Sequence, residues 1–167
     1  MRSAVLSVCL WCVAFAAQAQ TIPGVKVRYA FITEHQPGNI PVDPNNGRPL
    51  HAPGPDTLYT IYIETSTPQP VYWYAAWQKG ETYSINCTRV DKTPVEAGTK
   101  KKGGEKIIID TSKGGTLWRL DLFPAAKKLP SPAGLQPGEM LLQGVRGNKK
   151  IILRVSKLVE LSAIPSV

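Results

Sequence analysis

The sequence predicts an all-β protein, a single antiparallel β-sandwich of about eight strands that is immunoglobulin-like in the broad sense. Three observations favour this class. Apolar and polar residues alternate with a period of two along most segments. Turn signals rich in glycine separate these segments at short intervals. No segment carries an apolar stripe of period 3.6 bounded by helix caps.

The alternation assigns the strands one after another. In residues 25–32, Val25, Val27, Tyr29 and Phe31 share one face and Lys26 lies on the other, which is typical of a strand with one wet side. Further strands are predicted at 58–64, 71–77, 82–89, 106–110, 117–123, 139–145 and 150–161. In the last of these, one face would carry Ile151, Leu153, Val155, Val159 and Leu161. The signals between strands are Lys79-Gly80, Gly103-Gly104, Gly114-Gly115 and Gly147-Asn148, the last predicting a two-residue hairpin turn with positive φ.

The N-terminal segment has the pattern of a secretory signal peptide. Arg2 precedes an almost unbroken apolar run, and Ala17-Gln18-Ala19 is a small-x-small cleavage site. The run is shorter than the ~20 residues that a membrane-spanning helix needs, and no other stretch is long and apolar enough. We therefore expect a signal peptide at 1–19, one domain at 20–167, and a secreted or periplasmic protein that does not span a membrane.

Charge and cysteine content limit the classes of partner that we expect. The chain has 20 Lys and Arg against 12 Asp and Glu, a formal charge of +8 that favours solubility. Cleavage would leave Cys87 alone, either as a buried inert thiol or as half of an intermolecular disulfide. The run 100–106 forms a basic patch or, more simply, a solvated hairpin tip, and it lacks the interleaved aromatics of single-strand binding, so nucleic acid is not the expected partner. The lysines of this run are Lys100, Lys101, Lys102 and Lys106.

Residues 71–77, VYWYAAW, hold the strongest binding signal. Strict alternation places Val71, Trp73, Ala75 and Trp77 on one face, which we expect to be the core. Tyr72 and Tyr74 then share the other face, ~7 Å apart along the strand. Two exposed rings at this spacing would stack on a sugar or a peptide, whereas buried rings would pack on Tyr59 or Tyr62 of a neighbouring strand.

Two long loops rich in proline and glycine are predicted at 34–57 and 124–138, and loops of this length are often functional or disordered. The first holds further candidate binding residues, namely His35, His51 and Asp43. Their spacing matches no compact metal motif, and DPNNG fails the calcium-loop pattern, so we predict neither a metal nor a cofactor. Asn86-Cys87-Thr88 satisfies the N-glycosylation pattern, which matters only in a eukaryotic host.

The sequence contains no nucleophile elbow, phosphate-binding loop, zinc-protease motif or dinucleotide fingerprint. We therefore expect an exported, non-catalytic binding protein of the cell envelope or extracellular space, with a protein or glycan partner. Two alternatives stay open. One is a small secreted enzyme that acts on glycans through paired carboxylates. The other is a structural or assembly component that adds a strand to a partner through a sheet edge.

Overall fold

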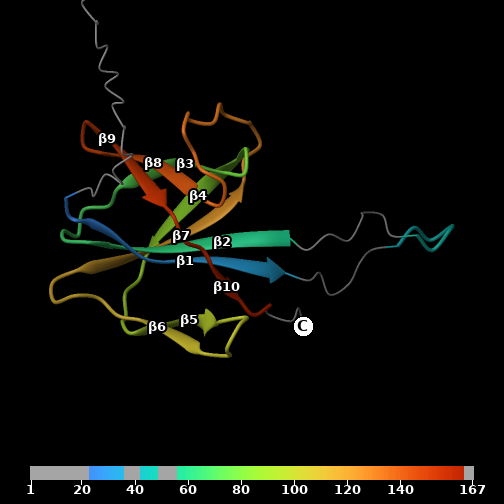
Figure 1. The fold of residues 1–167 in the computed structure, drawn as a ribbon, viewed down its shortest axis with the longest axis horizontal. Coiled ribbons are helices and arrows are strands. Elements are labelled where there is room, and N and C mark those ends of the chain that lie inside the picture. The colour runs from blue at the N-terminus through green and yellow to red at the C-terminus, as the bar shows by residue number, and fades with distance from the viewer. Residues whose placement is uncertain (1–22, 36–41, 49–55, 164–167) are drawn as a thin grey trace, which may run out of the picture.

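The computed structural model describes residues 23–35, 42–48 and 56–163, and in these residues the chain is all-β, without a helix. Ten strands are labelled in Figure 1. In chain order they are β1 (Val25–His35), β2 (Asp56–Thr65), β3 (Tyr72–Gln78), β4 (Glu81–Arg89), β5 (Val95–Thr99), β6 (Lys106–Ile109), β7 (Thr116–Pro124), β8 (Met140–Arg146), β9 (Lys149–Val155) and β10 (Val159–Leu161). Turns with positive φ at Lys79-Gly80 and at Gly147 reverse the chain between β3 and β4 and between β8 and β9, as predicted.

Eight strands form one large sheet in the order β10-β1-β2-β7-β4-β3-β8-β9, and β5 pairs with β6 alone. All neighbours are antiparallel except β1 and β10, which run parallel where Phe31–Thr33 meet Val159–Leu161. The expectation of a purely antiparallel protein was therefore wrong for this pair. The predicted division into two packed sheets is not confirmed, because one continuous hydrogen-bonded sheet carries all eight strands.

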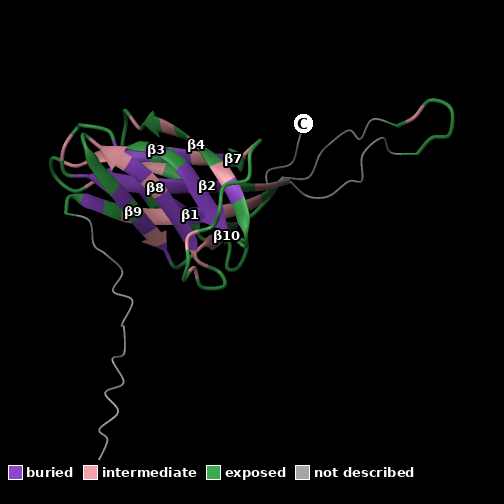
Figure 2. Ribbon diagram, turned by 90° about the horizontal axis from the view of Figure 1, so that it is seen from above, coloured by how far each residue is buried: buried purple, intermediate pink, exposed green. Residues whose placement is uncertain are grey.

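The large sheet curls around its main hydrophobic core. Buried and exposed residues alternate along its strands, which Figure 2 shows as alternating bands. The inner face collects buried side chains from six strands, and the best buried of them are Ile61, Ile63, Leu120, Leu122, Met140 and Leu142. Tyr83, Ile85 and Cys87 of β4 pack against this core from its margin.

The β5–β6 hairpin covers the outer face over β1, β2 and β7 (Figure 1). Ile107 and Ile109 of the hairpin pack on Phe31, Tyr62 and Leu117 of the sheet, all of them buried. Strand β5 was missed by the sequence reading because Ala97 and Gly98 weaken its alternation. The register also shifts between Glu96 and Gly98, which breaks the period of two.

The predicted strand 150–161 is in fact two strands. Residues 156–158 adopt no regular structure and separate β9 from β10. As a result Ile151, Leu153 and Val155 face the inner core, whereas Leu161 and Val159 join the outer cluster beneath the hairpin. The prediction that these residues share one face was wrong, because β10 moves away from β9 to pair with β1.

Candidate functional site

A β-bulge in β3 decides which aromatic side chains are exposed. Trp73 lies opposite Gly144 and Ala75 opposite Gln143, so Tyr74 is an extra residue without a partner on β8. Trp73 and Ala76 consequently pack in the inner core, whereas Ala75 and Trp77 pack on the outer face. The prediction that Trp73 and Trp77 share one face was wrong, because strict alternation assumes a strand without a bulge.

Gly144 on β8 makes room for the inner side of this strand. A Cβ atom at Gly144 would lie 2.7 Å from the carbonyl oxygen of Tyr72 and 2.9 Å from Cε3 of Trp73. The Trp73 ring therefore lies across the β8 backbone, where any larger residue would displace it. This close packing on the inner face restricts the movement of β3, and the tyrosines project from its outer face.

The outer face of β3, β8 and β9 carries an aromatic surface. Directly opposite residues share a face, so Tyr72, Val145 and Lys150 form one row, and Gln143 and Ile152 form the next, beside Tyr74. The exposed fractions are 71% for Tyr72, 41% for Tyr74 and 38% for Ile152. We name this surface the tyrosine platform, made of Tyr72, Tyr74, Gln143, Val145, Lys150 and Ile152.

The two tyrosines are not packed against the tyrosines of β2. The Tyr59 ring instead contacts Tyr83 edge-on at 5.3 Å, and the Tyr62 ring contacts Phe31 at 6.0 Å. Of the two arrangements considered from the sequence, the structure has the one in which the rings of Tyr72 and Tyr74 are exposed. The neighbours of these tyrosines on β8 and β9 could not be found from the sequence, since nothing local specifies which residues of other strands lie beside them.

Residues 124–138 border the platform at the end where β3 and β8 carry Trp77 and Leu141. Leu135 packs on these two side chains, and the Trp77 indole Nε1 donates to the Leu129 carbonyl at 3.4 Å. Arg154 Nη1 donates to the Gly134 carbonyl at 3.0 Å and pairs with Glu139 at 3.1 Å. The predicted long loop is therefore an ordered cover over one end of the outer face (Figure 1).

A groove crosses the outer face over β2 and β7. Two adjoining concavities of about 420 and 240 Å³ share Leu58, Thr60 and Arg119. Asp121 accepts hydrogen bonds from Thr60 Oγ1 at 2.9 Å and Arg119 Nε at 3.0 Å. Burial raises the pKa of Tyr62, which lines this groove, and Asp121 adds to the rise while Arg119 opposes it. Thr60, Arg119 and Asp121 thus form a small hydrogen-bonded network in this groove.

The lysines of 100–106 lie close to acidic side chains. Lys100 pairs with Glu105, Lys101 with Glu34 at 3.2 Å, and Lys106 with Glu96 at 3.1 Å. These exposed pairs add little stability, but they offset much of the local positive charge. The geometry favours a solvated hairpin tip over a site for an anionic polymer, and the basic patch, with Lys102, stays a prediction.

Of the candidate residues of the first loop, the structure describes Asp43 and the strand position of His35. His35 belongs to the end of β1, opposite Asp56 of β2. Asp43 organises its own turn by accepting from the Asn45 amide at 2.9 Å and from Asn46 Nδ2 at 2.7 Å. His51 lies outside the described residues. Within 23–35, 42–48 and 56–163, no three His, Cys, Asp or Glu side chains gather as metal ligands would.

Cys87 and Asn86 lie on opposite faces of β4. Cys87 is half-buried against the inner core, and burial raises the pKa of its thiol. A raised pKa keeps the thiol protonated and unreactive at neutral pH. Asn86 is exposed on the outer face, opposite Asp121 of β7, so a glycan there would not disturb the core.

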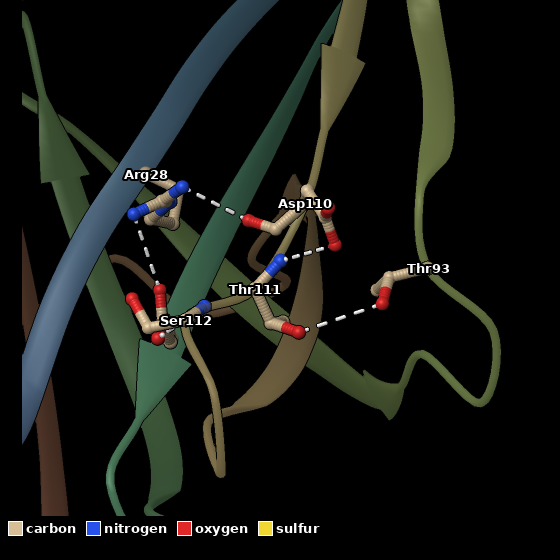
Figure 3. A network of polar contacts seen from close by, with 6 residues as sticks. Arg28, Thr93, Asp110, Thr111 and Ser112 are labelled. Carbon is tan, nitrogen blue, oxygen red and sulfur yellow. Dashed lines mark hydrogen bonds and ion pairs between the residues drawn. The ribbon is translucent and has the colours of Figure 1, made fainter.

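A polar network joins β1 and β2 to the link between β6 and β7 (Figure 3). Arg28 Nη1 lies 3.3 Å from the buried Glu64 carboxylate, and Nη2 donates to the Asp110 carbonyl at 2.9 Å. The Ser112 amide donates to Glu64 Oε1 at 3.0 Å. Glu64 also lies so close to Gly115 that a Cβ atom there would meet its side chain at 2.3 Å. The Glu64 carboxylate of β2 therefore connects β1 with the link between β6 and β7.

Comparison with known proteins adds no family: no family profile, curated protein or solved structure matches this chain. Of the residues that the structure describes, none form a helix that could cross a membrane. Function must be argued from the surfaces themselves.

Proposed function

We propose that this chain is an exported, non-catalytic binding protein of the cell envelope or extracellular space, whose tyrosine platform stacks against the sugar rings of a glycan. The curled sheet would serve as an immunoglobulin-like sandwich in the broad sense, with two halves packed on a shared core. Export rests on the signal-peptide pattern of residues 1–19, and secreted material should begin near Gln20.

The observation that carries this proposal is the exposure of two tyrosines next to each other on a firmly held strand. Flat apolar rings that face water bind the apolar faces of sugars or peptides, while the tyrosine hydroxyls and Gln143 can form hydrogen bonds at the edges. Exposed apolar groups gathered on one face and rimmed by polar residues mark interaction sites in soluble proteins. Lys150 at the edge adds a positive charge that suits an acidic glycan.

The test is retention of the mature chain on insoluble polysaccharides and peptidoglycan. We expect Tyr72→Ala/Tyr74→Ala to reduce retention at least tenfold, because two stacking contacts of roughly 1 kcal/mol each would be lost. The free energy of unfolding should change by less than ~0.5 kcal/mol, since exposed rings contribute little burial.

The matched control is Leu58→Ala/Phe123→Ala, which removes two exposed apolar side chains from the groove over β2 and β7. This control should retain full binding. The proposed ligand is wrong if the tyrosine variant has an unchanged free energy of unfolding and is still retained. It is also wrong if the unaltered protein binds none of these glycans.

A further inference from the structure

The large sheet is open along one side. Strand β9 is one of its edges, and at the other edge β10 pairs with only the Phe31–Thr33 stretch of β1. In the part of the chain that the structure describes, residues 25–30 of β1 and all of β9 therefore have a strand neighbour on one side only. Their backbone N–H and C=O groups on the free side are available to a further strand.

The first half of β1 and the end of β9 face each other across a cleft. One concavity of about 330 Å³ is lined by residues 27–30 of β1 and by Arg154, Val155, Ser156, Lys157 and Val159. We name it the β1–β9 seam. Next to this cleft Phe31 pairs with Val159, the first pair between β1 and β10.

The seam is wide enough for a strand. Hydrogen-bonded strands lie about 4.8 Å apart, so a strand flanked on both sides needs its neighbours ~10 Å from each other. The Cα atoms of β1 and β9 stay more than 8 Å apart along almost all of their length. The inner wall is apolar, because Ala30 and Val155 are buried in the main core and Val27 packs against it.

The rim of the seam is positively charged. Lys157 lines the cleft, and Lys26 and Lys149 lie on the two strands that border it. All three are exposed, and none has an acidic partner among the described residues. The two arginines nearby are already engaged, Arg28 with Glu64 and Arg154 with Glu139. The charge repels a second copy of the same edge, which is how natural edge strands avoid self-association, and it attracts an acidic segment.

We propose that the β1–β9 seam accepts an extended acidic segment of a partner protein, which adds as a strand between β9 and the first half of β1. Backbone hydrogen bonds to both edges would hold the segment, small apolar side chains would face Val27 and Val155, and alternate acidic side chains would reach the lysines. This inference goes beyond the proposed glycan platform, since it uses a different surface and a different class of partner.

The probe is a labelled peptide of alternating glutamate and valine, six residues long with blocked ends. Six extended residues span about 20 Å, close to the length of the free edge of β1. We expect saturable binding in fluorescence polarisation. Hydrogen exchange should slow at amides of residues 25–30 and 149–157. The same peptide with N-methyl groups at alternate residues should bind at least tenfold more weakly, because it lacks the donors of a ladder.

Two charge variants distinguish peptide binding at the seam from nonspecific electrostatic attraction to the protein. Lys149→Glu/Lys157→Glu should weaken peptide binding at least tenfold, and Lys92→Glu/Lys127→Glu, which makes the same change in net charge outside the seam, should weaken it less than threefold. Tyr72→Ala/Tyr74→Ala should bind the peptide normally. Equal binding of the N-methylated peptide, equal loss in both charge variants, slowed exchange elsewhere, or dimerisation of the free protein would overturn the proposal.

Discussion

The two halves of the outer face share one sheet and differ in what covers them. Over β1, β2 and β7, the β5–β6 hairpin buries Phe31 to 1% and Tyr62 to 5% exposure. Over β3, β8 and β9, residues 124–138 cover only the end with Trp77, and Tyr72 stays 71% exposed. The same residue type is thus a core residue in one half and a surface residue in the other. The difference shows that exposure here follows from which segment folds over the strand and not from the strand itself.

The largest effect should come from the covered half. Phe31→Ala removes a buried ring that stacks on Tyr29 and meets Tyr62 edge-on, and we expect a loss of ~3–5 kcal/mol in the free energy of unfolding. Urea unfolding measures it, and Tyr72→Ala in the open half is the matched control, with a loss below ~0.5 kcal/mol. Similar losses for the two variants would mean that the halves are equally packed.

Alkaline pH provides a second test of the covered half. Burial holds the pKa of Tyr62 above its usual value, so the neutral phenol is favoured in the folded state. The contribution of the neutral Tyr62 phenol to the free energy of unfolding is complete below pH ~10, where the tyrosine of the unfolded chain is still neutral. This contribution is lost as the pH rises through the pKa that Tyr62 has in the folded protein. Chemical unfolding from pH 8 to 11 should show stability falling above pH ~10, and less steeply in Tyr62→Phe. The same fall in both proteins would assign the effect to other groups, including Tyr59, whose pKa is raised to about 12.

The smallest effect should come from the partial cover. Leu135 is only half-buried, on Trp77 and Leu141, so Leu135→Ala should cost about 1 kcal/mol, less than a fully buried leucine. Thermal unfolding measures the loss, and the change should leave glycan retention intact because the platform residues do not depend on it. A loss above ~3 kcal/mol would show that residues 124–138 belong to the core of the fold.

The sequence predicted most strands because each has one wet face. The segments 58–64, 82–89 and 117–123 match β2, β4 and β7 within two residues at each end, since their alternation is unbroken. The prediction failed where the period of two is interrupted, at the bulge in β3, at the glycine-containing β5, and at the break between β9 and β10. It also failed in β1, where the register shifts between Val27 and Tyr29, so that Val27 packs against the inner core and Phe31 lies in the outer cluster. These interruptions are set by pairing with distant strands, which a local pattern does not contain.

The candidate site shows the same limit. Tyr72 and Tyr74 stood out in the sequence because aromatic residues are concentrated there. Val145, Lys150 and Ile152 became part of the same surface only through the register of β3, β8 and β9. The facing edges of the β1–β9 seam could not be inferred at all, because the curl of the sheet brings together strands that are far apart in the chain.

The bulge at Tyr74 has an evolutionary consequence. A residue with no partner on the neighbouring strand can be gained or lost in a single insertion or deletion while every other pair in the ladder keeps its register. Trp73 would still face inward and Trp77 outward on either side of such an event. One codon is therefore enough to give this strand its second exposed ring or to remove it while the core stays the same.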